Sequence, residues 1–315
     1  MAAHEVAGSG AHEPVMLREV VEALEEIPTG IFLDATVGAG GHASALLERR
    51  PDLTCVGLDR DPEALAMAAR RLPDGVRLAQ RRFDALGEAL AGWDVGCLAG
   101  ALFDLGASSM QLDDPGRGFS YRRGGPIDMR MDPTSGPCAA GIVNEWPAER
   151  LAGLLRGYGD EPNARRIARA VAANRPLRDT AELAEVVCSA VPPRRRRRSG
   201  HPAKRTFQAL RIAVNDELAQ IRPALSEVIG LLAPKGRGVV LSYHSGEDRI
   251  VKETLGEAAG GCTCPPRLPC VCGAVKCIAL LGRRARRPAA AEVQANPRSR
   301  SARLRAFEKL EATQS

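Results

Sequence analysis

Short apolar runs alternate with amphipathic segments along the first third of the chain. Residues 31–33 and 54–58 are apolar runs of the length of buried strands. Each precedes a segment with apolar residues at helical spacing, and Asp61 and Pro62 are residue types preferred at the start of the second helix. Further apolar runs at 95–105 and 238–243 continue the pattern. Strands that alternate with helices predict an α/β fold.

The middle of the chain lacks this alternation. Residues 139–190 show helical spacing only, and no strand-like run interrupts them. Because the strand pattern resumes at 238–243, we expect a helical insertion in an α/β domain, with the chain returning to that domain near residue 220. We place the first part of that domain at 1–110, the inserted loop and helices at 111–219 and the second part at 220–315. Insertions of this kind commonly recognise substrate.

A glycine-rich turn follows the first apolar run. Asp34 closes the run, and Gly38, Gly40 and Gly41 allow a close backbone approach before a helix begins near His42. A strand, a glycine turn and a helix together present backbone N–H groups to a polar or anionic ligand. The sequence therefore predicts a ligand site at this turn.

The glycine spacing alone leaves three interpretations open. Gly38-x-Gly40-x-x-Ala43 fits an NAD-type fingerprint, an S-adenosylmethionine (SAM) site or a structural turn. Asp59 lies about 20 residues past the glycines, where a carboxylate that binds a ribose diol is expected. Asp34 favours SAM, because an acid before such glycines is similar to the first motif of class I SAM-dependent methyltransferases. Thr36 departs from that motif, which usually has its first glycine there.

Two further positions fall where nucleotide-binding folds contact their ligand. Phe83 follows a predicted third strand, where it would wall an adenine ring or simply pack in the core. Asp104 ends the run of 95–105, and a carboxylate at the carboxyl end of such a strand faces the active crevice of an open α/β sheet. Asp104 could instead cap the next turn, but Asp34 and Asp59 also end strands, which favours a shared site.

Basic segments surround these motifs. The segment 111–133 is too long for an idle loop, and its arginines could face phosphates or pair with its own aspartates. A run of five arginines at 194–198 precedes a predicted helix with Lys204, Arg205 and Arg211. With a net charge of +6, these features favour an RNA partner, although a solvated basic surface accounts for the charge equally well. The basic tail beyond residue 295 is either a final strand or an RNA-facing arm.

Five of the nine cysteines crowd between Cys262 and Cys277. Two C-x-C pairs among them would supply a tetrahedral structural zinc site, formed by Cys262, Cys264, Cys270 and Cys272. Free thiols are the alternative, because this spacing is tighter than the usual C-x₂-C. The sequence shows no leader-like start and no apolar run of membrane length, so we expect a cytoplasmic protein with no membrane partner.

Seven ordered stretches exceed a generic cofactor signal. They are HEPVML at 12–17, DATVGAGGH at 34–42, GLDRDPEAL at 57–65, DLGASSMQLDDPGRGFSYRRGGPIDMRMDP at 104–133, KRTFQALRIAVNDEL at 204–218, SYHSGEDRIVK at 242–252 and NPRSRSARLRA at 296–306. Together they closely resemble the RsmH (MraW) family of bacterial 16S rRNA cytosine-N4 methyltransferases. The chain departs from a common form of that family at 37–39, in the arginine run and in the cysteine cluster.

The resemblance implies a fold, a reaction and a cofactor site. The fold is a class I SAM-dependent methyltransferase, a Rossmann-like doubly wound sheet, with an inserted all-helical substrate-recognition domain. The substrate is a cytidine in the decoding centre of 16S rRNA. Carried over by motif, the SAM contacts fall on Gly40, Gly41, His42, Asp59, Phe83, Asp104 and Gln111.

The implied reaction needs a proton acceptor. The N4 amine of cytosine is a poor nucleophile because its lone pair is delocalised into the ring, so an acceptor for N4–H would assist and take up the proton. We assign this role to Asp104, with Ser242 or His244 as the second candidate. The target base must leave any stack to reach these residues.

Two other classes of protein are also compatible with the sequence. A Rossmann dehydrogenase would bind a nicotinamide cofactor, but it gives no reason for the long loop and the helical insertion. A non-enzymatic RNA-binding protein would bind SAM or NAD without transferring a methyl group. The sequence does not distinguish a monomer from a homodimer, nor free 16S rRNA from the assembled small ribosomal subunit as the partner.

Overall fold

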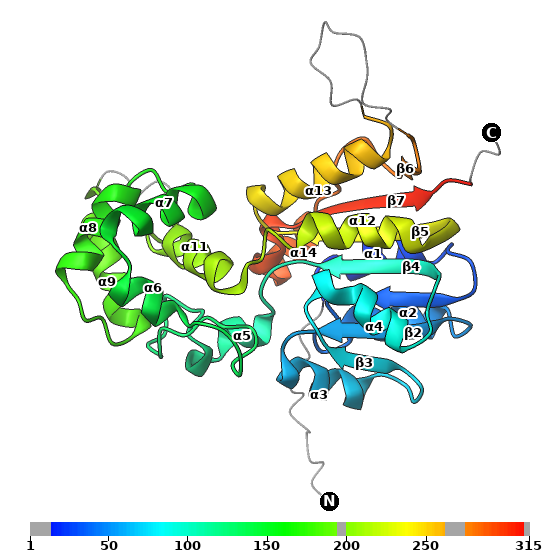
Figure 1. The fold of residues 1–315 in the computed structure, drawn as a ribbon, viewed down its shortest axis with the longest axis horizontal. Helices are drawn as coiled ribbons and strands as arrows, with labels where there is room; N and C mark the ends of the chain where they lie inside the picture. Colours follow the sequence, from blue (N-terminus) through cyan, green and yellow to red (C-terminus); the bar gives the residue numbers. More distant parts are fainter. Residues whose placement is uncertain (1–13, 194–199, 262–274, 312–315) are drawn as a thin grey trace, which may run out of the picture.

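The computed structural model describes residues 14–193, 200–261 and 275–311. Figure 1 shows an α/β core and a separate helical lobe, which is inserted in the chain between strands β4 and β5. The described part contains no helix that is both long and apolar enough to cross a membrane.

The core is built on a seven-stranded sheet with the order β3-β2-β1-β4-β5-β7-β6. Its strands are β1 (Ile31–Asp34), β2 (Thr54–Asp59), β3 (Arg77–Gln80), β4 (Leu98–Asp104), β5 (Leu232–Ser242), β6 (Ile278–Leu280) and β7 (Arg303–Lys309). The pairings among β1 to β5 are parallel, and β7 runs antiparallel to both β5 and β6. The order reverses at β1, beside β4, which places a crevice at the carboxyl ends of these strands.

Helices cover both faces of the sheet because the strand side chains alternate. In β4, Leu102 faces one apolar cluster and Phe103 faces the other. The first cluster is closed by α1 (Leu17–Leu24), α2 (Gly41–Arg49) and α3 (Pro62–Arg71). The second is closed by α4 (Leu86–Gly92), α12 (Ile221–Leu231) and α13 (Ser245–Ala258). This arrangement confirms the doubly wound class I methyltransferase fold.

The lobe has its own apolar core. Its helices are α5 (Ser109–Asp113), α6 (Ala139–Glu145), α7 (Ala148–Gly159), α8 (Ala164–Ala173), α9 (Thr180–Ala190) and α11 (Lys204–Asn215). In α8, Ile167 and Val171 are buried in that core, whereas Arg165, Arg166 and Arg169 are exposed. The helices expected between 139 and 190 are therefore present, and each buries a stripe of small and aliphatic residues.

Some elements differ from the sequence-based expectation. Gln111 was expected in a loop but lies in α5, because Ser108 and Gln111 form a capping box that starts a short helix. Of the two alternatives for the basic tail, the final strand is correct, since β7 pairs along β5. The three-residue β6 and the short helix α14 (Ala290–Ala295) were not predicted.

Candidate active site

Three acids meet at one edge of the sheet. Asp34, Asp59 and Asp104 end the parallel strands β1, β2 and β4. Asp34 is buried, and its Oδ1 accepts a hydrogen bond from the Thr36 N–H at 3.2 Å. Burial raises the pKa of Asp34 to about 8, so this carboxyl is largely neutral at neutral pH. Asp34 therefore holds the turn rather than presenting a charge.

Asp59 connects the glycine turn to the next helix. Its Oδ2 accepts from the Gly38 N–H and its Oδ1 from the Asp61 N–H, both at 2.9 Å. Burial raises the pKa of Asp59 to about 6. The side chain is half-buried, and a carboxylate has about four acceptor sites, so sites remain for two ribose hydroxyls.

The glycine turn leaves room beside Asp59. Gly38 and Gly40 have φ of 52° and 77°, which favour glycine. A Cβ on Gly38 would meet only the Thr36 carbonyl oxygen, at 3.9 Å, so the space there is open. At Gly41 a Cβ would instead lie 2.4 Å from Pro14 Cγ, so this glycine serves packing. Open space beside a half-buried carboxylate fits the nucleoside part of SAM.

Phe83 and Gln111, two further predicted cofactor contacts, are each held by a neighbouring side chain. Phe83 is half-buried and meets Phe103 edge to face, with ring centroids 5.9 Å apart. Gln111 is buried, and both ends of its amide are engaged. Its Oε1 accepts from the Ser108 N–H at 3.0 Å, and its Nε2 donates to Asp61 Oδ2 at 2.8 Å.

Asp104 lies close to polar side chains from two other parts of the core. The Tyr243 hydroxyl donates to Asp104 Oδ1 at 2.7 Å, and His42 Nδ1 lies 3.7 Å from Oδ2. His42 Nε2 lies 3.0 Å from the carbonyl oxygen of Val15, which can only accept, so Nε2 carries a proton. Burial raises the pKa of Asp104, whereas His42 and the Tyr243 hydrogen bond oppose that rise.

The structure gives a role to Thr36, which stands where the first motif of class I methyltransferases usually has a glycine. Its hydroxyl accepts from the backbone N–H of Asp104 at 2.6 Å. The side chain that replaces a glycine thus ties the loop after β1 to the end of β4. It fixes the distance between the glycine turn and the Asp104 carboxylate.

The two other catalytic candidates flank Tyr243. Ser242 is buried, and its hydroxyl lies 3.5 Å from the Arg303 carbonyl oxygen on β7. His244 is the N-cap of α13, with Nδ1 accepting from the N–H groups of Gly246 and Glu247 at 3.2 and 3.4 Å. Tyr243, which was not predicted, is the residue of this stretch that contacts Asp104.

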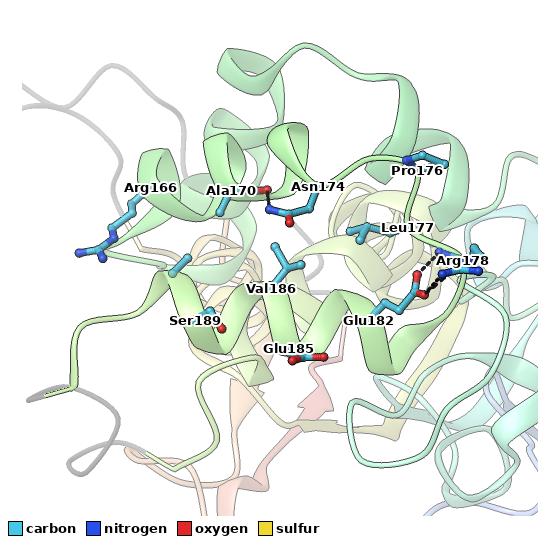
Figure 2. A pocket seen from close by; sticks show the side chains of 11 residues that line it. Arg166, Ala170, Asn174, Pro176, Leu177, Arg178, Glu182, Glu185, Val186 and Ser189 are labelled. Atoms are coloured by element: carbon cyan, nitrogen blue, oxygen red, sulfur yellow. Dashed lines mark hydrogen bonds and ion pairs between the residues drawn. The ribbon is translucent and has the colours of Figure 1, made fainter.

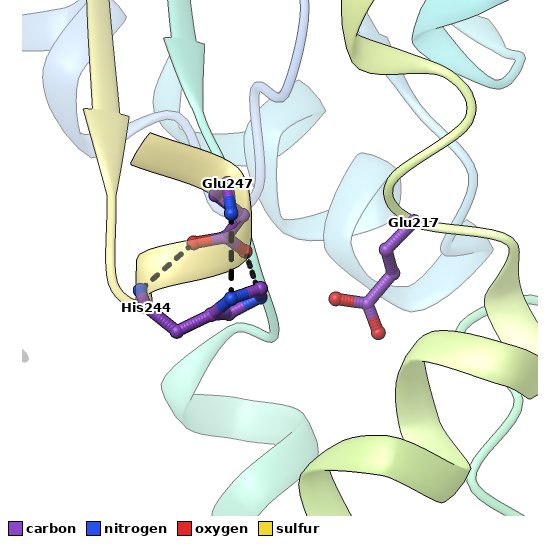
Figure 3. A group of neighbouring side chains, drawn as sticks. All are labelled: Glu217, His244 and Glu247. Carbon is purple, nitrogen blue, oxygen red and sulfur yellow. Dashed lines mark hydrogen bonds and ion pairs between the residues drawn. The ribbon is translucent and has the colours of Figure 1, made fainter. Parts of the chain in front are cut away.

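Glu217, His244 and Glu247 bring metal-ligating atoms within 4.8 Å of one another (Figure 3). A neutral His244 that accepts at Nδ1 carries its proton on Nε2, which therefore offers no lone pair to a metal. Both Glu217 oxygens accept from Arg211, at 2.8 and 2.7 Å. We interpret the group as a buried charge network in which Arg211 supplies the positive charge.

The arginines of 111–133 mostly have partners within the protein. Arg117 pairs with Asp61 at 2.9 Å, and Arg130 pairs with Asp128 at 2.7 Å. Arg211 on α11 is likewise engaged by Glu217. The five-arginine run and the cysteines proposed to bind zinc, Cys262 to Cys272, lie outside the described residues, so both stay predictions.

The lobe carries a separate hollow of about 610 Å³ between α8 and α9 (Figure 2). Arg178 and Glu182, which pair at 2.9 Å, lie at one end, and Arg166 lies at the other. None of the predicted site residues in the described part of the chain lines it. The candidate active site is therefore the strand edge and not this hollow.

Three known proteins that are similar to this chain carry the same name. Ribosomal RNA small subunit methyltransferase H of Symbiobacterium thermophilum is 47% identical over 309 residues, which are 96% of this chain and 97% of that protein. The proteins of the same name from Acidothermus cellulolyticus and Rubrobacter xylanophilus are 49% and 50% identical. They cover 96% and 93% of this chain, and each match spans 94% of the relative.

The sequence model of the MraW methylase family matches residues 9–310. This range includes all seven stretches that carried the resemblance, and the strand-edge acids lie within it. The chain therefore belongs to the MraW methylase family.

Proposed function

We propose that this protein transfers a methyl group from SAM to N4 of a cytidine in the decoding centre of 16S rRNA. Family membership and the shared name of its relatives support an rRNA substrate. The observation that carries the N4 assignment is the Asp104 carboxylate. It sits half-buried where β4 ends. Its Oδ1 accepts a hydrogen bond from Tyr243, and its Oδ2 lies 3.7 Å from His42 Nδ1, which is beyond hydrogen-bond distance.

The SAM site is proposed at the glycine turn. Asp59 would accept from the ribose hydroxyls, the segment 38–42 would border the amino-acid part, and Phe83 would border the adenine. When bound, SAM supplies an electrophilic methyl group on a sulfonium. The protein's task is to present the amine and to accept its proton.

Of the three candidate proton acceptors, Asp104 suits the N4 amine best. A carboxylate that accepts from N4–H draws electron density back onto the amine and takes up the proton after transfer. The Ser242 hydroxyl faces β7, and His244 Nδ1 is engaged in capping α13. Holding the amine in line with the methyl group supplies much of the remaining acceleration.

The helical lobe would hold the RNA. Arg165, Arg166 and Arg169 form an exposed stripe on α8, and Lys204 and Arg205 are exposed on α11. Phosphate contacts from such residues supply affinity that falls as salt rises. A ribosomal substrate would place the protein in the cytoplasm.

The experiment is methyl transfer from labelled SAM to small ribosomal subunits, followed by nucleoside analysis. Label in N4-methylated cytidine would support reaction, substrate and atom together. Label on another base or on ribose would overturn the N4 assignment while leaving a methyltransferase. Label on free 16S rRNA alone would mean action before assembly, and no label on either would favour a binding protein.

A further inference from the structure

Tyr243 lies next to the proposed proton acceptor because of the sheet register. Asp104 pairs with Leu241 across the parallel strands β4 and β5, so the residues just beyond Leu241 emerge beside the Asp104 side chain. Tyr243 is two residues further on, and its hydroxyl reaches Asp104 Oδ1 at 2.7 Å. The contact joins residues 139 positions apart in the sequence.

The backbone that carries Tyr243 is fixed by Glu247. Glu247 Oε2 accepts from the N–H groups of Tyr243 and His244, at 2.7 and 3.2 Å. The Glu247 side chain is 1% exposed and has His244 Nε2 at 3.0 Å. Burial raises the pKa of Glu247, but His244 and Arg211 outweigh it and the pKa is lowered, so Glu247 stays charged. A charged acceptor makes these backbone hydrogen bonds strong.

We propose that Tyr243 is a positioning residue for the methyl transfer, which holds Asp104 by Oδ1 so that Oδ2 receives the proton of the cytosine amine. The proposal rests on the proposed function. In the step, the N4 lone pair would form a bond to the methyl carbon, and the carbon–sulfur bond would break with its electron pair left on a neutral thioether. The N4–H bond would break with its electron pair kept on N4, and the proton would form an O–H bond at Oδ2. Tyr243 keeps its own proton throughout.

The residues around Tyr243 favour its hydroxyl as a hydrogen-bond donor to Asp104, and not as the base that takes the proton of the amine. Burial and the adjacent Asp104 raise the pKa of Tyr243 well above its usual range, so the phenol stays protonated. Four groups face Asp104 or act on its charge: Tyr243 after β5, His42 on α2, Glu247 on α13 and Asp34 at the end of β1. Of these, Tyr243 donates a hydrogen bond to Asp104, and that bond favours the carboxylate form.

The test is Tyr243→Phe, which removes the hydroxyl and keeps the ring. We expect kcat near neutral pH to fall by about 10- to 100-fold, the range for losing a hydrogen bond to a charged group. We expect the acid limb of the kcat–pH profile to move to higher pH, because the carboxylate loses a donor. The Kd for SAM should not change. The matched control is Tyr158→Phe, since Tyr158 is exposed on α7, and its profile should follow wild type.

A second measurement is independent of turnover. Carboxyl ¹³C NMR titration of Asp104, assigned with Asp104→Asn, should show a higher pKa in Tyr243→Phe than in wild type. An unchanged pKa would overturn the proposal, because the hydrogen bond would then be absent in solution. A raised pKa with an unchanged kcat and acid limb would also overturn it. Wild-type protein that methylates no RNA would defeat the proposed function itself, before any variant is compared.

Discussion

Arg117 Nη2 lies 2.9 Å from Asp61 Oδ2, and this buried ion pair ties the segment 111–133 to the start of α3. Asp61 is fully buried, and Arg117 also donates to the Met131 carbonyl oxygen at 2.8 Å. The arginine therefore organises both the N-terminus of α3 and the path of the long loop. Its role is structural, although the sequence places it among arginines that could meet phosphate.

Removing this arginine should destabilise the protein strongly. Arg117→Met leaves a buried carboxylate without its charge partner, for which we expect a loss of about 3 kcal/mol in the free energy of unfolding. The control is Arg298→Met, because the Arg298–Asp113 pair is largely exposed, at 41% and 55%, and should contribute less than about 1 kcal/mol. Denaturant unfolding measures both. Equal losses would show that burial does not distinguish the two pairs.

Asp104→Asn should separate chemistry from cofactor binding. The amide can still accept a hydrogen bond from Tyr243 but cannot take a proton, so kcat should fall by about 10²–10⁴-fold. SAM affinity, measured by calorimetry, should be retained. In wild type, kcat should fall as pH drops through a midpoint above the usual aspartate range, because burial raises the pKa of Asp104. Full turnover in the variant would assign the acceptor role elsewhere.

Asp59→Asn should weaken SAM binding and remove its dependence on pH. The pKa of Asp59 is raised to about 6 by burial, so wild type should bind SAM more weakly as pH falls from 7.5 towards 5 and the carboxylate is protonated. The variant should be weak at both pH values. The measurement is calorimetric titration of wild type and variant with SAM at pH 7.5 and pH 5. An equal loss of SAM affinity in the two proteins between these pH values would exclude Asp59 as the ribose acceptor.

The strand-edge acids could be predicted from the sequence because local patterns determine them. Apolar runs of strand length end in Asp34, Asp59 and Asp104, and parallel strands bring their carboxyl ends together. The sequence also predicted Asp61 as the N-cap of α3, and the structure confirms it. These inferences need only short windows of sequence and the topology of an α/β unit.

The contacts that orient those acids could not be predicted. Whether Tyr243 or its neighbours reach Asp104 depends on the register between β4 and β5, strands separated in the chain by the whole lobe. The pairing of Arg117 with Asp61 likewise joins distant segments. The roles of Asp34 and Gln111 were hidden for another reason, since burial and capping are properties of the folded chain.

The stability of the protein should depend on Asp34 in a pH-dependent way. The folded pKa of about 8 lies above the ordinary value of 3.8, so the stabilisation is complete below about pH 4 and is lost as pH rises towards 8. Asp34→Asn can still accept from the Thr36 N–H and does not titrate. Its Tm should therefore exceed that of wild type by an amount that grows between pH 5 and 9. A constant difference in Tm would mean that Asp34 is not protonated in the folded state.

Gly238→Ala should destabilise the sheet because Phe307 occupies the space of a side chain. Gly238 lies opposite Phe307 in the β5–β7 pairing, and a Cβ there would come within 2.2 Å of the Phe307 ring. Since both residues are buried, relief requires the Phe307 ring or β7 to shift, and we expect a loss of about 1–3 kcal/mol in the free energy of unfolding. The control is Gly256→Ala in α13, where a Cβ meets nothing within 4 Å. We expect Gly256→Ala to raise the free energy of unfolding by about 0.5–1 kcal/mol, because alanine has the higher helix propensity. Opposite shifts in the denaturation midpoint are expected, and shifts of the same sign would mean that Phe307 does not fill this space in solution.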